Sequence, residues 1–468
     1  MQYRLSSYMI VSDRLKNGGY AVLNGLSGTV ELISESLFQV LQRVLETNDS
    51  HVLYIENDLL PPDVFQLFIR RGLLIGINHD EEREYARIMA SSLHKVSSEH
   101  PSAVIVPDLD CNYRCVYCFE KSLQSGLKGR KTKMNKQDID AVYRSIDQIE
   151  LEIGPINKTI SLFGGEPLLS ANKSVVEYII ECGQQRGHNI FASTNGHDLD
   201  AYINSLGSDK IEHLQITLDG PPSIHNKRRI TLDGSPSFER IVKNIHHAID
   251  LTDVAITLRV NLDEGNFSSF SDLLHIFDQA GWLSNDRVSV KVAMVGQRDG
   301  NGSLVPILDI NNARRELATI VEPYPSVAIG YPQSHFVFEG FYALISGNTY
   351  RLRGAHCTAS SGGFVFLPDG TISACWESLG EECSYIGRYS ADGLSLDTDK
   401  VKQWFGRSAD KIDGCLDCKY CLLCAGGCAQ QAKSKTGDPY QPYCEDFKET
   451  YPWVLAEAVE TFLTSQNL

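Results

Sequence analysis

The sequence predicts an α/β protein: a partial (β/α)6 barrel of the TIM type, preceded by a winged-helix-like domain and followed by a cysteine-rich domain. Three observations predict this. Short apolar runs alternate with helical stretches in the middle of the chain, the N-terminal part has a pattern of its own, and the 13 cysteines are clustered. A chain of 468 residues is too long for one ordinary core, so several domains are expected.

Residues 1–98 are predicted to form the winged-helix-like domain. Two alternating apolar runs around turn residues in 20–34 are typical of a β-hairpin. Apolar residues at helical spacing follow over 34–46, and further helices are expected over 63–71 and 81–96. A hairpin followed by three helices favours this type of fold.

Residues 99–300 are predicted to form the barrel, because strand and helix patterns alternate there. Helical stretches such as 136–151 and 173–186 separate short apolar runs. Repeated strand–helix units imply a parallel sheet or barrel, in which ligands bind at the carboxyl ends of the strands. The expected strands are 103–106, 159–163, 189–193, 214–218, 256–261 and 288–295.

The rest of the chain divides into a connector, a cysteine-rich domain and a terminal helix. Residues 301–355 are less periodic and are expected to be a connector. Residues 356–448 are rich in Cys, Gly and short turns, and their few apolar runs indicate that this segment needs bound metal to fold. Residues 449–468 are predicted to end the chain with a helix.

Composition narrows the classes of function. The net charge is −16 and no block of Lys and Arg occurs, which argues against a nucleic-acid partner. No apolar run is long enough to span a membrane and no secretory signal is present, so a cytoplasmic protein is expected. Clustered thiols in that reducing compartment usually bind metal rather than form disulfides. Cys182 stands apart in a helical stretch, and we expect it to serve packing.

A motif of three cysteines follows the first predicted barrel strand. Cys111, Cys115 and Cys118 have the spacing C-x3-C-x2-C, with Tyr117 before the last. Three thiolates can hold three irons of a [4Fe–4S] cluster and leave the fourth iron open; the alternative is a zinc site completed by a distant His. The motif resembles the signature of the radical S-adenosylmethionine (SAM) enzymes. The resemblance implies that the open iron binds the amino and carboxylate groups of SAM, whose reductive cleavage yields a 5′-deoxyadenosyl radical.

Further motifs follow the next strands and fall on the same rim. GGEP at 164–167 is similar to an element of that family, in which the glycines let the backbone approach the ligand and Glu166 can accept a hydrogen bond from the SAM ammonium. STNG at 193–196 and TLDG at 217–220 lie where the family contacts SAM. Arg259 is expected either to clamp the SAM carboxylate or to form a structural ion pair. The candidate SAM-binding residues are Tyr117, Gly164, Gly165, Glu166, Asn195, Thr217, Asp219, Arg259 and Asn261.

A second set of cysteines resembles the SPASM domain, the auxiliary-cluster extension of peptide-modifying radical SAM enzymes. Its centre is C-x2-C-x5-C-x3-C, preceded by C-x12-G-x4-C and followed by one more cysteine. The alternative for such spacing is a zinc ribbon. The resemblance implies two auxiliary [4Fe–4S] clusters. One is held by Cys415, Cys418, Cys424 and Cys444, and the other by Cys357, Cys375 and Cys428.

The Cys357 cluster is one ligand short in this pattern. Fully ligated family members supply a further Cys a few residues earlier, and the segment 351–357 offers none. Cys383, Cys421 and His356 are candidate substitutes. The other interpretation is an open iron that binds a substrate thiolate.

The family resemblance implies a peptide maturase. Residues 1–98 are similar to the RiPP recognition element, so the leader of a ribosomal precursor peptide is expected to add to the edge of the small sheet there. The radical is expected to abstract hydrogen from the core peptide and to form an intramolecular crosslink. A thioether from a substrate Cys, as in sactipeptides and ranthipeptides, is the first choice. SAM, three [4Fe–4S] clusters and an electron donor such as flavodoxin or ferredoxin would be required.

Several alternatives stay open at the level of sequence. C–C or C–O crosslinking, epimerisation and the formylglycine chemistry of an anaerobic sulfatase maturase use similar clusters, and a non-enzymatic electron carrier is a further reading. Asp108, Asp110 and Glu120 flank the first cysteines. Charged residues are common on any such rim, so the sequence assigns no catalytic acid or base.

Overall fold

The structure is a computed structural model, and every predicted site residue lies within the part of the chain that it describes. Parts of the predicted connector 301–355 lie outside that part. The described residues are 3–46, 60–121, 123, 129, 131–298, 304–306, 310–324, 326–330, 335–348, 352–444 and 447–466.

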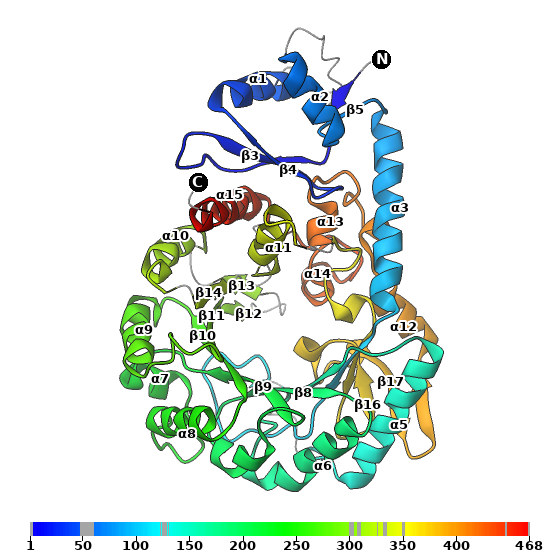
Figure 1. Cartoon of the computed structure of the whole chain (residues 1–468). Helices are drawn as coiled ribbons and strands as arrows, with labels where there is room; N and C mark the ends of the chain where they lie inside the picture. Colours follow the sequence, from blue (N-terminus) through cyan, green and yellow to red (C-terminus); the bar gives the residue numbers. More distant parts are fainter. Residues whose placement is uncertain are drawn as a thin grey trace. The chain divides into compact units, whose positions relative to one another are not determined.

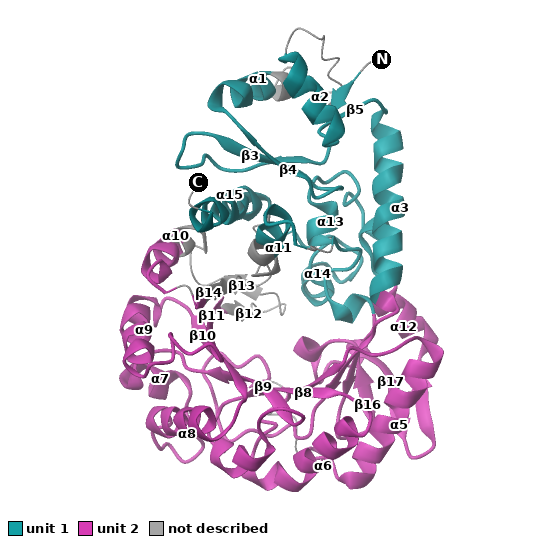
Figure 2. Ribbon diagram, viewed as in Figure 1, with its two compact units in different colours: residues 1–97, 333–361, 407–468 teal, residues 98–332, 362–406 magenta. Residues whose placement is uncertain are grey.

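Two compact units make up the chain (Figure 2). The first comprises residues 1–97, 333–361 and 407–468, and the second comprises 98–332 and 362–406. Unit 1 therefore joins the N-terminal residues to most of the cysteine-rich segment, whereas unit 2 joins the predicted barrel to the rest of it.

A curved sheet of eleven strands forms the centre of unit 2. Its order is β14-β11-β10-β9-β8-β7-β6-β15-β16-β17-β18, parallel from β14 to β15 and antiparallel beyond. The six predicted strands are all present, which confirms the α/β class. They are β6 (Ser102–Ile105), β7 (Thr159–Leu162), β8 (Asn189–Thr194), β9 (Ile211–Thr217), β10 (Ala255–Leu262) and β11 (Val288–Met294).

The sheet extends past the predicted strands at both edges. The predicted connector 301–355 contains two strands, β13 (Leu304–Pro306) and β14 (Val327–Gly330), and two helices among its described residues, and β14 pairs with β11. On the other side, β15 (Gly363–Phe366) pairs in parallel with β6, although the sequence placed it in the cysteine-rich domain. The strands that follow are β16 (Thr371–Ser373), β17 (Tyr385–Ser390) and β18 (Gly393–Leu396).

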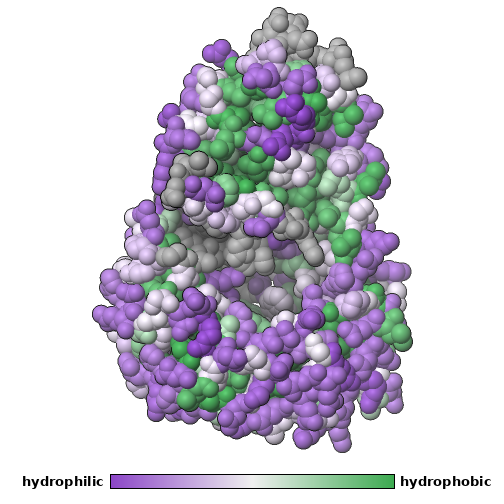
Figure 3. Space-filling model, viewed as in Figure 1, coloured by the Kyte–Doolittle hydropathy of each residue, from purple (hydrophilic) through white to green (hydrophobic). Residues whose placement is uncertain are grey.

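Helices cover the outer side of this sheet, as Figure 1 shows for α5, α6, α8 and α9. In α5 (Lys136–Glu152), Asn135 and Asp138 form a capping box, and Ile139, Val142 and Ile146 lie buried on one face at helical spacing. Hydrophilic side chains cover much of the opposite, outward face of these helices in Figure 3. The other helices of unit 2 are α6 (Lys173–Gln184), α7 (Pro222–Arg228), α8 (Phe238–Leu251), α9 (Phe270–Gln279), α10 (Ile310–Val321) and α12 (Thr398–Phe405).

Unit 1 begins with a small antiparallel sheet in the order β2-β3-β4. Its strands are β2 (Met9–Val11), β3 (Tyr20–Asn24) and β4 (Val30–Ile33), and the predicted hairpin corresponds to β3 and β4. The three predicted helices are present as α1 (Glu35–Glu46), α2 (Pro62–Arg70) and α3 (His79–Ser98). A further short pairing joins β1 (Arg4–Leu5) to β5 (Leu74–Ile75). The winged-helix-like character of this part stays a prediction.

A shared apolar core binds α3 to the cysteine-rich part of unit 1. Ala86 and Ala90 of α3 pack in one cluster with Tyr8, Leu422 and Cys421. The Tyr8 hydroxyl donates to the Leu416 carbonyl oxygen, so contacts between the N-terminal residues and a cysteine loop are both apolar and polar. The remaining helices of unit 1 are α11 (His335–Ile345), α13 (Cys421–Cys424), α14 (Ala429–Thr436) and α15 (Phe447–Ser465).

A two-stranded antiparallel pair joins β12 (Gly296–Arg298) and β13 (Leu304–Pro306). None of the helices within the described ranges is both long and apolar enough to span a bilayer. The 3-10 turns are η1 (Ser170–Asn172), η2 (Leu199–Ser205), η3 (Phe267–Ser269), η4 (Thr358–Ser360), η5 (Trp376–Ser378), η6 (Glu382–Ser384) and η7 (Ala409–Lys411).

Candidate active site

The three-cysteine loop follows β6 at the carboxyl end of the parallel sheet. The Cys118 amide donates to the Cys115 carbonyl oxygen at 3.2 Å, which closes a tight turn between these two cysteines. Cys111 is buried, Cys115 and Cys118 are half-buried, and the cysteines of the described chain form no disulfide. The loop therefore presents three thiols in their reduced form at the edge where parallel sheets bind ligands.

These thiols fit a [4Fe–4S] cluster by their chemistry. Cys111 Sγ accepts hydrogen bonds from the Tyr113 amide at 3.3 Å and from Asn195 Nδ2 at 3.9 Å, as a thiolate ligand does. Burial raises the pKa of Cys111, and it raises that of Cys118 to about 11, so iron is needed to hold them as thiolates. Within the described ranges, no three His, Cys, Asp or Glu side chains gather as a single metal ion requires. A cluster makes a different demand, because each thiolate binds a separate iron.

Gly164 and Gly165 let two rim loops approach each other closely. A Cβ on Gly164 would lie 2.7 Å from the Asp108 carbonyl oxygen, and one on Gly165 would collide with that of Asp110. Gly164 also has a φ of 129°, which side chains rarely adopt. The Glu166 amide donates to the Asp110 carbonyl oxygen at 2.9 Å. The glycines thus fix the loop after β7 against the cysteine loop; their approach to SAM stays a prediction.

Glu166 joins the ends of β7 and β8. Its Oε1 accepts from Thr194 Oγ1 at 2.7 Å, and its Oε2 accepts from the Asn195 amide at 2.6 Å. The Leu168 amide also donates to Oε1 at 2.8 Å. Burial raises the pKa of Glu166 to about 7, although these hydrogen bonds lower it. Three of about four acceptor positions of the carboxylate are used, which leaves room for one further donor.

The Tyr117 hydroxyl is the centre of a second network. It donates to Asp219 Oδ2 and accepts from Asn261 Nδ2 at 3.2 Å. The Asn261 amide also donates to Asp219 Oδ1 at 3.0 Å, and Arg259 Nε donates to Asn261 Oδ1 at 2.8 Å. Four predicted SAM-binding residues are therefore connected, and Thr217 pairs with Arg259 across β9 and β10. In the described chain, Arg259 takes part in no ion pair, so the structural ion pair considered for it is not found there.

Some residues of the site escaped sequence reasoning. Arg229 Nη1 donates to the Tyr117 hydroxyl at 2.9 Å, although 112 positions separate the two residues. Asn195 Nδ2 donates to Asn112 Oδ1 at 2.7 Å, and His197 Nδ1 lies 2.9 Å from the Tyr113 hydroxyl. Asn112 lies inside the cysteine motif and His197 directly follows STNG, so position alone could have marked them. Arg229 gave no local signal.

Two of the charged residues beside the cysteine loop are buried. Burial raises the pKa of Glu120 to about 7, with the nearby Glu166 as a second cause, and one of its oxygens, Oε1, lacks a hydrogen-bond partner among the described residues. Burial also raises the pKa of Asp108. Asp110, by contrast, caps the cysteine loop by accepting from the Cys111 amide at 2.8 Å. No substrate-facing acid or base follows from these contacts.

Six of the seven cysteines of the second set lie in unit 1. The Cys418 amide donates to the Cys415 carbonyl oxygen at 3.1 Å, the same turn as in the first loop. Burial raises the pKa of Cys415 to about 12, and the neighbouring Cys444 and Cys418 raise it further. Burial also raises the pKa of Cys424, and its neighbours Cys415, Cys444 and Cys418 raise it further. The four cysteines predicted to hold one auxiliary cluster therefore lie close enough to interact. Of the other three, Cys357 and Cys428 belong to unit 1 and Cys375 to unit 2.

The candidate substitute ligands have other contacts. Cys421 packs in the apolar core beside Tyr8 and α3. The Cys383 thiol donates to Glu381 Oε2 at 3.6 Å. His356 Nδ1 lies 3.0 Å from the Cys424 carbonyl oxygen, and burial lowers the pKa of its imidazole to about 4.

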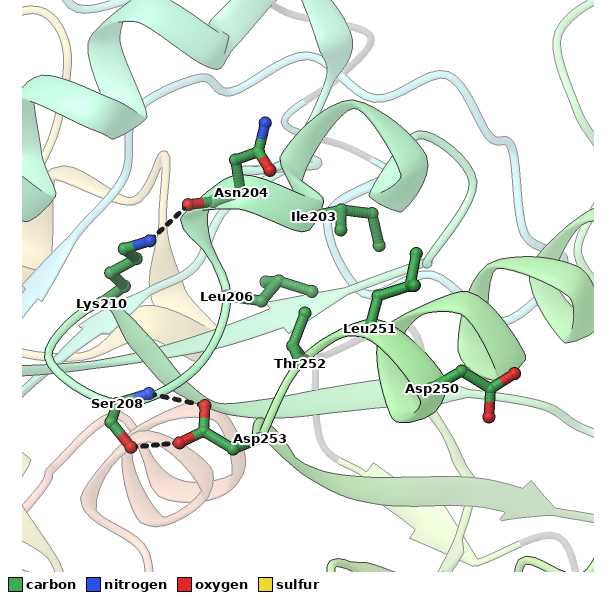
Figure 4. Close-up of a pocket in the computed structure, with 9 residues that line it drawn as sticks. All are labelled: Ile203, Asn204, Leu206, Ser208, Lys210, Asp250, Leu251, Thr252 and Asp253. Carbon is green, nitrogen blue, oxygen red and sulfur yellow. Dashed lines mark hydrogen bonds between the residues drawn. The ribbon is translucent and has the colours of Figure 1, made fainter.

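One cavity of about 580 Å³ lies away from this site (Figure 4). Lys210 and Asp253 line it where β9 and β10 begin, whereas the cysteine loop lies where the parallel strands end. Asp253 already accepts from the Ser208 amide at 2.9 Å, and Lys210 donates to the Asn204 carbonyl oxygen at 2.7 Å. This cavity does not belong to the candidate active site.

Comparisons with known proteins agree with the site. Residues 106–275 match the family model of the Radical SAM superfamily. The chain is similar to the radical SAM cyclopropyl synthase TigE of Paramaledivibacter caminithermalis, with 23% identity over 461 residues, 93% of this chain and 91% of that protein. A cysteine-type anaerobic sulfatase-maturating enzyme of Clostridium novyi is 21% identical over 354 residues, 73% of this chain and 91% of that enzyme.

The fold is similar to the crystal structure of Streptococcus suis SuiB. The TM-score is 0.51 at 15% identity, and the match covers 94% of this chain and 98% of SuiB. This similarity confirms the predicted fold class, and the family match over 106–275 confirms the predicted enzyme class. The cysteine loop and the rim residues around it lie within residues 106–275, and this part of the chain is a radical SAM domain.

Proposed function

We propose that this enzyme is a peptide maturase that forms an intramolecular crosslink in a ribosomal precursor peptide. Reductive cleavage of SAM at the cluster would supply a 5′-deoxyadenosyl radical that takes hydrogen from the core peptide. The observation that carries the proposal is the combination of two thiol sets in one chain. One lies at the rim of the sheet, and six of the seven cysteines of the other lie in unit 1, where a shared core joins a cysteine loop to the N-terminal residues.

The rim residues have complementary roles in this proposal. Cys111, Cys115 and Cys118 would hold the cluster, and the remaining acceptor position of Glu166 suits the SAM ammonium. Arg259, oriented by Asn261, is the candidate clamp for the SAM carboxylate. The binding surface would be completed by Tyr117, Gly164, Gly165, Asn195, Thr217 and Asp219.

The auxiliary cysteines favour a thioether as the product. In this proposal Cys415, Cys418, Cys424 and Cys444 hold one [4Fe–4S] cluster, and Cys357, Cys375 and Cys428 hold a second that keeps an open iron. The other contacts of Cys421 and Cys383 support the open iron. His356 remains the competing ligand, because a ligating His commonly donates its other ring nitrogen, as Nδ1 does here toward a carbonyl. An open iron would bind and deprotonate a substrate thiol.

The N-terminal residues would bind the leader of the precursor. The described sheet leaves β4 at its edge, where Leu32 is 50% exposed. An extended peptide can add to such an edge through backbone hydrogen bonds. We expect Leu32→Glu to weaken binding of a leader peptide at least tenfold while SAM cleavage without peptide is unchanged. Fluorescence anisotropy with a labelled leader measures this, and equal affinity of both proteins would contradict the leader site.

The product is identified by tandem mass spectrometry. Anaerobically reconstituted enzyme would receive SAM, a flavodoxin or ferredoxin reducing system, and a short precursor peptide encoded beside its gene. A thioether removes two hydrogens and one free thiol that alkylation would otherwise label. Formation of 5′-deoxyadenosine with an unchanged peptide would contradict the assigned substrate.

A carbon–carbon bond is the second candidate, and the similarity to the cyclopropyl synthase TigE along 93% of the chain favours it. The same experiment separates the two products, because a C–C crosslink removes two hydrogens and leaves every thiol open to alkylation. The sulfatase-maturating relative matches 73% of this chain, and formylglycine from a Cys or Ser substrate would identify that activity instead.

A further inference from the structure

Arg407 is a buried arginine that contacts backbone carbonyls rather than a carboxylate. Its side chain is among the largest in the described chain with almost no exposure, 1% for the residue as a whole. Nη1 donates to the Gly427 carbonyl oxygen at 2.7 Å, Nη2 to that of Gly426 at 2.8 Å and to that of Gln441 at 3.2 Å, and Nε to that of Pro439. None of the ion pairs found in the described part of the chain involves Arg407.

These carbonyls belong to two loops that carry proposed cluster ligands. Gly426 and Gly427 lie between Cys424 and Cys428, and Gln441 lies three positions before Cys444. One guanidinium therefore holds the loops of three ligands, and the three belong to both proposed auxiliary clusters. Its planar, forked donors suit this task, whereas the ammonium of a lysine could not reach four carbonyls in fixed directions.

The loop that Arg407 holds has an unusual backbone. Ala425, Gly426 and Gly427 all have positive φ, at 52°, 82° and 72°. A side chain on Gly427 would collide with the Tyr443 carbonyl oxygen, and the Tyr443 amide donates to the Gly426 carbonyl oxygen at 3.1 Å. A residue with a side chain, such as Ala425, keeps this left-handed conformation only where its surroundings support it, and the donors of Arg407 on the next two carbonyl groups contribute to that support.

The charge of Arg407 has thiols as its neighbours. Burying a cation without a counter-charge is costly. Burial accordingly lowers the pKa of Arg407, while Cys428, Cys357, Cys415 and Cys424, in the thiolate form, raise it. All four are proposed cluster ligands and all lie in unit 1. A thiolate-ligated iron–sulfur cluster is an anion that gains one more negative charge on reduction, so a buried cation beside it favours the reduced state.

We propose that Arg407 is a positioning residue for the auxiliary clusters, fixing their ligand loops by its hydrogen bonds and raising their reduction potentials by its charge. This inference rests on the proposed function, because it assumes that the auxiliary clusters form. This role has a consequence for the direction of electron transfer. The auxiliary clusters are made better acceptors of the one electron released when the substrate radical closes to product, and the proton released in the same step goes to solvent.

The test compares Arg407 variants in protein without the SAM cluster. In a Cys111→Ala/Cys115→Ala/Cys118→Ala background, only the auxiliary clusters give an iron–sulfur signal. Iron and sulfide content, together with a redox titration followed by electron paramagnetic resonance, would be measured for Arg407→Lys and Arg407→Met. A background protein that holds no iron would contradict the auxiliary clusters and hence the proposed function, not the role of Arg407 alone.

The two variants separate charge from hydrogen bonding. We expect Arg407→Met to lower the equilibrium constant for cluster reduction about tenfold, a shift of about 59 mV for a one-electron couple. Arg407→Lys keeps the charge, so its potentials should stay near those of the parent while its cluster content falls. Unchanged potentials and unchanged iron content in Arg407→Met would overturn the proposal.

If Arg407→Met takes up no iron, that loss supports the positioning role. The effect of charge on the reduction potential is then tested with two other variants. Arg407→Gln keeps hydrogen-bond donors without charge, and Arg407→Lys keeps charge with fewer directed donors. Potentials that are lower in the Gln variant than in the Lys variant support the role of charge. Equal potentials in the two would overturn it.

Discussion

The two cysteine loops contain the same tight turn, but they differ in the buried charge beside them. Around Cys111–Cys118, arginines face carboxylates: Arg228 pairs with Asp263 at 2.7 Å, and Arg229 shares the Tyr117 hydroxyl with Asp219. Beside the unit 1 cysteines, Arg407 faces carbonyl oxygens and thiols. Arg228 and Arg229 at the first site are thus balanced by carboxylates of the protein itself, and Arg259 is assigned to the SAM carboxylate, whereas Arg407 offers a positive charge that an anionic cluster can balance.

The difference in buried charge affects which cluster gives an electron and which receives one in the proposed reaction. Glu166 and Glu120 add buried carboxyl groups to the surroundings of the first loop, which disfavours a further negative charge there. Arg407 has the opposite effect in unit 1. A low potential suits a cluster that must reduce SAM, and a higher one suits a cluster that receives an electron. The two loops are therefore suited to opposite directions of electron transfer.

Removing ligands from each loop in turn gives the largest expected effect. The Cys111→Ala/Cys115→Ala/Cys118→Ala protein should lose SAM cleavage to background and keep its auxiliary iron. Cys415→Ala should lose auxiliary iron and keep SAM cleavage without peptide, because Cys415 lies in unit 1 and the three-cysteine loop lies in unit 2. Iron analysis and quantification of 5′-deoxyadenosine by chromatography measure both. Cys182→Ala, at a buried cysteine in α6, is the control and should change neither. SAM cleavage by the triple variant would break the comparison at its first step.

Removing one tyrosine hydroxyl beside each cysteine loop should separate an effect on SAM affinity from an effect on the free energy of unfolding. Tyr117→Phe deletes the hydroxyl that Asp219, Arg229 and Asn261 share, and we expect SAM affinity to fall about 10- to 100-fold, as for other partners that orient a ligand site. Tyr8→Phe deletes only the hydrogen bond to Leu416, which should cost about 1–3 kcal/mol of unfolding free energy and leave SAM affinity unchanged. Equilibrium dialysis and chemical denaturation test the two effects. Equal SAM affinity of Tyr117→Phe and the parent would remove Tyr117 from the binding site.

The pH dependence of SAM binding should report Glu166. Its pKa is raised to about 7 by burial, so the folded protein keeps a proton that the unfolded chain loses near pH 4.5. That contribution to stability is present below pH 4.5 and is lost as pH rises toward 7. SAM brings an ammonium that prefers the ionised carboxylate, so its affinity should rise about tenfold per pH unit between pH 5 and about 7.

Two variants check which carboxyl group is responsible. Glu166→Gln should bind SAM weakly and without this pH dependence. Glu120→Gln should keep the slope, because the hydrogen bonds that join β7 to β8 are made by Glu166 and not by Glu120. A slope that disappears in Glu120→Gln and persists in Glu166→Gln would reassign the ammonium site.

Sequence reasoning reached the strands and the motifs because both depend on neighbours along the chain. The barrel strands have continuous apolar runs, and GGEP, STNG and TLDG each follow such a run. Parallel pairing then places those motifs on one rim, and Glu166 and Asn195 meet there through a 2.6 Å hydrogen bond.

The contacts that sequence reasoning missed join residues far apart in the chain. Arg229 reaches Tyr117 across more than a hundred positions, and Arg407 reaches loops whose only common feature is their cysteines. Neither arginine stands in a motif. The packing of α3 on the cysteine loop was missed for a related reason: Ala86 and Ala90 are small residues whose helical face indicates burial but not the partner.

The smallest expected effect tests whether burial, rather than proximity, gives Arg407 its influence. Arg83 also contacts a cysteine loop, through Asp417 at 2.7 Å, but 45% of its side chain and 50% of that of Asp417 are exposed. Exposed ion pairs contribute about 0.2–1 kcal/mol, and water screens their field. Arg83→Met should therefore lower the unfolding free energy by less than about 1 kcal/mol and leave the auxiliary potentials unchanged. If Arg83→Met shifted the potentials as far as Arg407→Met, any nearby cation would suffice, and the contrast between a balanced loop and an unbalanced one would lose its physical basis.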